Sequence, residues 1–145
     1  MFKIQYKIQS EQFNDVRNIT EDEIHYDFLL GSLSLLASDA EIDMEWDWIP
    51  LLDFAYCMKE IVFALKKYDV AFEIFEFTEN SEILKFSLHN DQLKVSASFS
   101  SIFIDTSLTD FESAVMDFHL SISNYIRTNV IELPKVLSKY LFVER

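Results

Sequence analysis

The sequence is poor in the residues that build most phosphate-binding and catalytic loops. It contains one glycine, Gly31, whereas a Walker loop, a dinucleotide-binding fingerprint and a nucleophile elbow each need at least two. Its one cysteine, Cys57, permits no internal disulfide bond, so nothing indicates an oxidising compartment. The sequence has neither a signal-peptide pattern at its N-terminus nor an apolar run of roughly 18 residues, the length of a transmembrane helix. We therefore expect a cytoplasmic protein.

Basic residues are also scarce. The chain has 12 Lys and Arg against 25 Asp and Glu, which gives a net charge of −13. A protein this acidic is repelled by nucleic acids and by anionic membrane surfaces, so we expect neither as a partner. It attracts basic proteins instead, and this attraction raises association rates as well as affinity. Acidity that serves only solubility is the competing explanation.

Apolar residues are abundant. Half of the 145 residues are hydrophobic and 14 are Phe, which excludes a disordered chain because burial of these groups offsets the entropy cost of ordering. A chain of this length forms one domain with its own core. No Pro/Ser-rich linker or convincing sequence repeat is present, so we predict a single domain over residues 1–145.

Hydrophobic periodicity predicts strands that alternate with two long amphipathic helices. Pro50 suits the first position of one helix, which we expect to end near Asp69, and Thr109 and Glu112 match a capping box for the other. The expected strands are 2–9, 24–37, 39–48, 70–77 and 83–89, followed by 93–99 with residues 102–104 as an extension of that last strand. A short final helix follows Pro134. We predict an α+β fold in the order βββα-βββα(α), with one antiparallel sheet of about six strands and both long helices on one face.

The most specific feature is a strand in which acids alternate with apolar residues. Because side chains two residues apart share a strand face, this pattern predicts an acidic ladder, which comprises Glu41, Asp43, Glu45 and Asp47. Asp53 and the cluster Glu21, Asp22 and Glu23 are expected to flank it. Either the ladder is a solvated face that discourages edge aggregation, or it binds Arg and Lys of a basic partner. A calcium loop does not fit, because Met44 takes the required glycine position, and we expect neither a metal nor a cofactor.

Three histidines and Cys57 are the remaining candidates for chemistry. His25 falls in a predicted strand two residues from Asp27, so the two side chains share a face and resemble a general-base pair. No nucleophile stands beside them in a recognisable motif. An enzyme would need a pocket that gathers His25, Asp27 or His119. We predict instead a surface pair for His25, a position at the border of a helix core for His119 and a buried apolar role for Cys57.

The nearest feature to a motif is an acidic strand that runs directly into an amphipathic helix. Its sequence is Glu41-Ile42-Asp43-Met44-Glu45-Trp46-Asp47-Trp48-Ile49-Pro50-Leu51-Leu52. Together with its size and charge, the chain resembles the immunity proteins of bacterial polymorphic-toxin and contact-dependent inhibition systems. Those proteins are small, cytoplasmic, often strongly acidic and usually without catalytic motifs. The resemblance implies a protein that binds one cognate toxin, often a nuclease with a basic active site, and blocks it.

We therefore predict a non-enzymatic binding protein whose acidic ladder binds a basic toxin domain. The alternative is a structural or regulatory interaction module with an apolar interface, for example a homodimer built along an edge strand. Salt distinguishes the two, because binding between acidic and basic surfaces weakens as ionic strength rises and an apolar interface barely responds.

Overall fold

The computed structural model describes residues 1–9, 16–67 and 72–143. The first half of the chain forms β1 (Phe2–Ile8), a 3-10 turn (Val16–Asn18), α1 (Glu21–Tyr26), β2 (Leu30–Ala37), β3 (Ala40–Pro50) and α2 (Leu51–Lys67). The second half forms β4 (Phe72–Glu76), β5 (Ile83–His89), β6 (Gln92–Ala97), β7 (Ser100–Ser107), α3 (Leu108–Asn129) and α4 (Lys135–Ser138). Two predicted boundaries lie outside the described residues. They are the end of the first long helix near Asp69 and the start of the next strand at Val70.

The fold class is α+β, as predicted, but the strands form two sheets and not one. An antiparallel sheet of three strands has the order β1-β2-β3, and a second antiparallel sheet of four strands has the order β4-β5-β6-β7. The additional strand is β7. Residues 102–104 belong to it and do not extend the preceding strand, because the chain turns at Ser98 and Phe99 before β7 pairs back onto β6.

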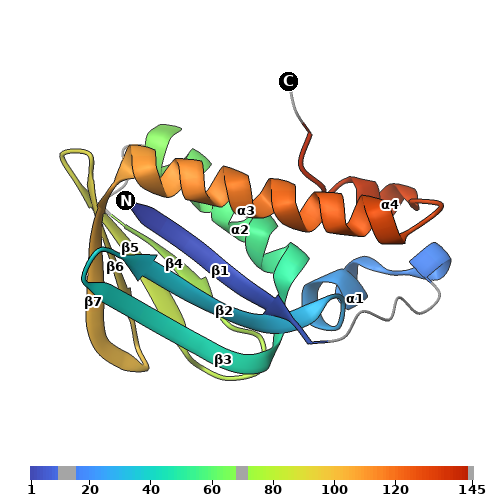
Figure 1. Ribbon diagram of the computed structural model, residues 1–145, viewed down its shortest axis with the longest axis horizontal. Helices are drawn as coiled ribbons and strands as arrows, with labels where there is room; N and C mark the ends of the chain where they lie inside the picture. The colour runs from blue at the N-terminus through green and yellow to red at the C-terminus, as the bar shows by residue number, and fades with distance from the viewer. Residues whose placement is uncertain (10–15, 68–71, 144–145) are drawn as a thin grey trace.

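The two long helices lie side by side against the sheets. α3 runs along β1, and α2 packs between α3 and strands of both sheets (Figure 1). Their apolar stripes face the strands, as the periodicity predicts, and Phe54 and Phe111 are fully buried. The ring of Phe54 lies 5.0 Å from that of Phe75 and 6.1 Å from that of Phe118, so one residue of α2 joins the second sheet to α3.

The two sheets meet through side chains where β3 lies beside β7. The two tryptophans of β3 stack with their ring centroids 5.3 Å apart. Trp46 also makes edge-to-face contacts with Phe77 at 5.0 Å and with Phe99 at 4.8 Å, the geometry that aromatic quadrupoles favour. These four rings form an aromatic seam, and both tryptophans pack against the core.

The strand predicted over residues 24–37 is wrong in its first six residues. Residues Glu21–Tyr26 form α1, because Thr20 caps the helix through its side chain and Glu23 reaches back to the backbone of Thr20. Leu29 then takes a left-handed backbone conformation with φ of 54°, and β2 starts at Leu30. The predicted alternation of Tyr26, Phe28 and Leu30 along one strand is therefore absent.

Two predicted helix starts are also shifted. The N-cap of α3 is Ser107, whose side chain accepts a hydrogen bond from the backbone N–H of Asp110 at 3.0 Å, so Thr109 lies inside the helix. Pro50 is the last residue of β3 and α2 begins at Leu51, where its N–H donates to the carbonyl of Leu29 at 3.0 Å. This hydrogen bond therefore anchors the start of α2 on the residue just before β2.

The described helices include none that is long and apolar enough to cross a membrane.

Candidate functional site

The acidic ladder lies on one face of β3, as the alternation predicts. Its four carboxylates belong to exposed residues, while Ile42 and Met44 between them have no solvent exposure. The backbone explains this arrangement, because successive side chains of a strand point to opposite faces and the apolar set packs against the core. The outward face of β3 therefore carries a row of carboxylates, and its apolar side chains pack against the core from the opposite face.

Serine hydroxyls of the neighbouring strand hold the carboxylates in place. The Ser34 hydroxyl lies 2.9 Å from Oδ1 of Asp43 and 3.2 Å from Oε1 of Glu41. A hydroxyl has one proton to donate, so two carboxylates share a single donor. The site is thus oriented by β2 without having its charge neutralised.

Asp47 ends the ladder at an irregularity in the pairing of β2 with β3. The register shifts between Gly31 and Leu33, and Asp47 takes a left-handed backbone conformation with φ of 64°, which Asp tolerates better than most residues. Ser32 stabilises this bulge, because its Oγ donates to Oδ1 of Asp47 at 2.8 Å and accepts from the Asp47 N–H at 3.0 Å. The bulge thereby fixes the direction of the last carboxylate.

A row of basic side chains on the same sheet face was not part of the sequence prediction. Register places Lys3 opposite Leu36 and Glu41 two strands away, and Lys7 opposite Ser32. Since adjacent strands lie about 4.8 Å apart, the lysine row and the acid row are separated by about 10 Å. The short serines between them leave a furrow of about 160 Å³ whose lining includes Lys7, Ser34 and Glu45. Had the strand order β1-β2-β3 been predicted from the sequence, it would have placed Lys3 and Lys7 on the same face as the acids.

The ladder keeps its negative charge despite these lysines. Within the described residues, no ladder carboxylate lies within 4.0 Å of a Lys or Arg nitrogen. Coulomb's law with the dielectric constant of water gives about 0.4 kcal/mol for unlike charges 10 Å apart, less than the roughly 0.6 kcal/mol of repulsion between adjacent carboxylates. The face is therefore anionic along β3 and turns basic only at β1.

The flanking acids predicted to join the ladder lie elsewhere. Asp53 sits in the first turn of α2, only 6% exposed, with its Oδ1 2.5 Å from Nδ1 of His25. Glu21 pairs with Lys139 at 2.9 Å, and this ammonium lowers the pKa of the Glu21 carboxyl. Glu23 serves the cap of α1, which leaves Asp22 as the exposed acid of that cluster with no ion pair to another described residue. Burial and local pairing thus remove Asp53, Glu21 and Glu23 from the acidic surface.

His25 is not a strand residue and does not pair with Asp27. It belongs to α1 and contacts Asp53, while the Cys57 thiol lies 3.9 Å from the same carboxylate oxygen. Burial raises the pKa of the Asp53 carboxyl, although the hydrogen bond from His25 opposes the effect. Burial also raises the pKa of the Cys57 thiol to about 12, so the sulfur stays protonated at neutral pH and is a poor nucleophile.

His119 lies apart from this group. It is 2% exposed, and its Nε2 donates to the carbonyl oxygen of Tyr140 at 2.7 Å. Burial lowers the pKa of the His119 imidazole. A pocket between α2 and β4 takes in His25 together with Asp53 and Cys57, whereas His119 lies elsewhere and fastens the C-terminal segment to α3. In the described part of the chain, no group of three or more His, Cys, Asp and Glu is placed to hold a metal ion.

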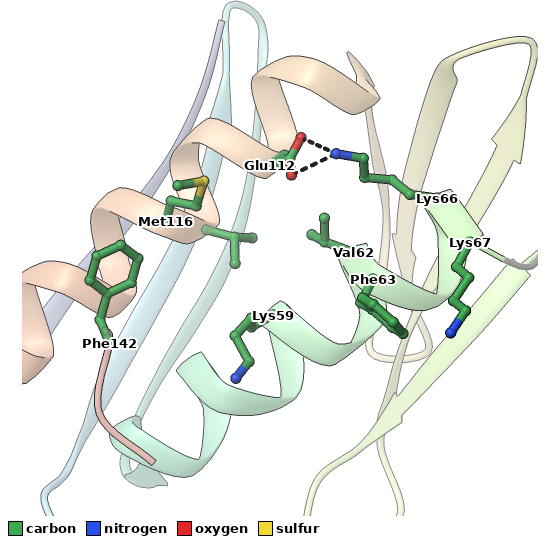
Figure 2. A pocket seen from close by; sticks show the side chains of 9 residues that line it. Lys59, Val62, Phe63, Lys66, Lys67, Glu112, Met116 and Phe142 are labelled. Carbon is green, nitrogen blue, oxygen red and sulfur yellow. Dashed lines mark hydrogen bonds and ion pairs between the residues drawn. The ribbon is translucent and has the colours of Figure 1, made fainter. Parts of the chain in front are cut away.

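A second surface feature is an apolar groove between α2 and α3. Figure 2 shows Val62, Phe63 and Met116 at this groove, with Phe142 of the C-terminal segment at one end. The cavity has a volume of about 470 Å³. Phe63 is 52% exposed and Met116 is 47% exposed, while Lys66 closes one side through hydrogen bonds to both carboxylate oxygens of Glu112.

No protein-family model matches the chain, and no curated protein or solved structure is significantly similar to it. The residues and their geometry are therefore the basis for a functional proposal.

Proposed function

We propose that this chain is a non-enzymatic binding protein, an immunity protein that neutralises a cognate basic toxin domain through the acidic face of β3. The observation that carries the proposal is the row of exposed carboxylates that lack a Lys or Arg partner among the described residues. Neighbouring like charges destabilise an isolated protein slightly, and a basic partner removes this repulsion on binding. The resemblance to small acidic immunity proteins supports the same assignment.

The geometry favours arginine-rich partners. Carboxylates accept paired hydrogen bonds from a guanidinium group, which adds direction to the charge attraction. Ser34 and Ser32 hold Glu41, Asp43 and Asp47 in fixed orientations, so little side-chain entropy is lost when a partner binds. The net charge of −13 accelerates the encounter, and the ladder then occupies the cationic cleft of the toxin.

The decisive experiment uses the gene directly upstream of this one. We expect it to encode a large secreted protein whose C-terminal domain stops growth when it is expressed alone and is harmless when this chain is co-expressed. A purified complex of the two proteins is the second expected result. If that C-terminal domain is not bound, or is not toxic, the immunity assignment is rejected.

Charge reversal tests whether the ladder is the binding surface. The double variant Asp43→Lys/Glu45→Lys should lower the association rate for the toxin domain at least tenfold and flatten its dependence on salt, because both steering and pairing are lost. Stopped-flow measurements at several salt concentrations provide the rates. The matched control is Asp117→Lys/Glu132→Lys, which changes the net charge equally at two exposed positions, one in α3 and one just after it. Equal rates for the two double variants would remove the ladder from the interface.

The groove between α2 and α3 supports a second candidate function, an interaction module with an apolar interface. The observation that favours such a module is that the ring of Phe63 and the thioether of Met116 are exposed at this groove (Figure 2). Partner binding through this groove would change little between low and high salt and would be weakened by Met116→Glu. Binding through the acidic face would instead weaken steeply as the salt concentration rises, and Met116→Glu would not weaken it.

A further inference from the structure

Along one edge of the outer strand β4, backbone hydrogen-bonding groups have no partner in the part of the chain that the structure describes. β4 pairs with β5 alone among the described strands. The N–H of Phe77 donates to the carbonyl of Glu82 at 3.1 Å, and this bond fixes which residues of β4 point toward β5. Since antiparallel strands alternate their bonded pairs, Glu73 and Phe75 bond to β5, whereas the N–H and C=O of Ile74 and Glu76 point to the free edge.

This free edge forms one wall of a groove. α2 lines the groove with Asp53, Tyr56, Cys57 and Glu60, and α1 lines it with His25 and Tyr26. Ile74 and Glu76 line the strand side, and the groove has a volume of about 470 Å³. Ile74 is 44% exposed and Tyr26 is 48% exposed, so apolar surface faces the space beside the unpaired backbone groups. α2 also packs against β4, which keeps the two walls in a fixed relation (Figure 1).

The free groups determine what fits this groove. Backbone donors and acceptors that repeat every second residue along a strand edge are satisfied by another extended chain. The charge of the lining adds a second condition, because it contains Glu60, Glu76 and an Asp53 paired with His25, and no Lys or Arg. Glu60 has a loose contact with Lys59 at 3.9 Å, and Glu76 has no ion pair within the described residues.

A second copy of this chain could pair its own β4 backbone with the free edge, but it would not bring basic side chains to the acidic lining. Antiparallel pairing of two β4 strands around Ile74 would place each Glu73 opposite a Phe75 and each Glu76 opposite a Phe72, so no glutamate would gain a basic partner. It would also join two molecules that each carry a net charge of −13. An extended segment with basic side chains supplies the missing opposite charge and is the better occupant.

We propose that the groove between β4 and α2 binds an extended basic segment of a partner protein, which adds to the sheet as a fifth strand beside β4. The backbone of Ile74 and Glu76 pairs with the segment, and its basic side chains approach Glu60 and Glu76. This site is separate from the acidic ladder on β3 and does not depend on the function proposed above.

The test uses a capped hexapeptide of alternating lysine and valine as the probe. It is titrated into the full ¹⁵N-labelled chain that carries Asp43→Lys/Glu45→Lys, so that the acidic ladder does not compete for the lysines. We expect chemical-shift changes centred on the amides of Ile74 and Glu76 and slower hydrogen exchange of the Ile74 amide. The same peptide with glutamate in place of lysine should not bind.

Two variants separate backbone pairing from simple charge attraction. Ile74→Pro removes one outward N–H and should weaken peptide binding about three- to tenfold, the range for loss of one hydrogen bond, whereas Ile74→Val should bind as the parent does. Glu76→Lys leaves the backbone intact and should also weaken binding. Circular dichroism checks that each variant is folded.

Three results would overturn the proposal. The first is a set of shift changes outside the groove, and the second is equal affinity of the folded Ile74→Pro and Ile74→Val variants for the peptide. The third is a concentration-dependent dimer of the free chain in which the Ile74 amide is protected, because that result would assign the edge to a second copy.

Discussion

Gly31 is the residue with the least freedom to vary. It is buried, and a Cβ added there would clash with the backbone carbonyl oxygen of Lys7 on the neighbouring strand and lie 2.8 Å from Cδ1 of Leu51. Its φ angle is not positive, so close approach of the backbones, and not backbone conformation, explains the glycine. The register shift in the pairing of β2 with β3 follows directly, between Gly31 and Leu33.

Gly31→Ala should therefore destabilise the protein. Because the clash is with backbone and cannot be relieved by a side-chain rotation, we expect a loss of about 2–3 kcal/mol in the free energy of unfolding. Urea denaturation followed by circular dichroism measures this change. Ser38→Ala, in the exposed turn between β2 and β3, is the control and should differ from the parent by less than about 0.5 kcal/mol. A Gly31→Ala protein as stable as this control would contradict the close approach.

The stability of the protein should depend on pH through His119. Burial lowers the pKa of this imidazole below its value in the unfolded chain, so the unfolded state binds the proton more readily. The contribution of His119 is complete above about pH 6.5 and declines as the pH falls below that value, by up to about 1.4 kcal/mol per pH unit. His119→Gln keeps a donor for the Tyr140 carbonyl and removes the titration. The free energy of unfolding of this variant should change less than that of the parent between pH 7.5 and 5.5. If the free energies of the two proteins change in parallel with pH, His119 does not cause the pH dependence.

At the scale of elements, β3 combines a structural and a binding role on its two faces. Ile42 and Met44 fix the strand on the core, and the acids between them occupy the opposite face. The binding role opposes stability, because Asp43 lies about 6.6–6.8 Å from both Glu41 and Glu45 along the strand.

Asp43→Asn should raise the free energy of unfolding by about 0.5–1 kcal/mol at low ionic strength, since two repulsions are removed while the amide oxygen still accepts from Ser34. Near 1 M salt, where charges are screened beyond about 3 Å, the difference should disappear. Urea denaturation at the two salt concentrations measures both values. A variant less stable than the parent at low salt would show that the Asp43 charge is stabilised within the fold.

The elements that could be predicted from the sequence are those with a strong local period. β1, β3, α2 and α3 each bury one face, so their apolar spacing alone identifies them. The helix α1 had a local signal as well, because Thr20 and Glu23 match the capping-box spacing that we assigned only to Thr109 and Glu112. The contact between His25 and Asp53 had none, because the two residues are 28 positions apart and lie on different helices.

At the scale of the whole molecule, the division into two sheets could not be predicted from strand order. Consecutive hairpins are compatible with one sheet or two, and the break depends on whether β3 pairs with β7 through its backbone. In this protein the aromatic seam joins them instead. Phe54 connects the second sheet to α3 through α2, so we expect the two sheets to unfold together.

Phe54→Ala tests this cooperativity. Loss of a fully buried ring should cost about 3–5 kcal/mol, and the urea transitions followed by tryptophan fluorescence and by circular dichroism should move together to lower urea. Met116→Ala, at an exposed position of α3, should leave both nearly unchanged. If the two transitions separate, the sheets are independent units and the prediction of a single domain fails.

The position of the aromatic seam has a practical consequence. Both tryptophans of the protein lie on β3, directly behind the carboxylates of the acidic ladder. Indole emission depends on the packing of neighbouring rings, so any ligand that displaces β3 relative to β7 changes the intrinsic fluorescence. Titrations of the acidic surface can therefore be followed without an attached dye, in the unlabelled native chain.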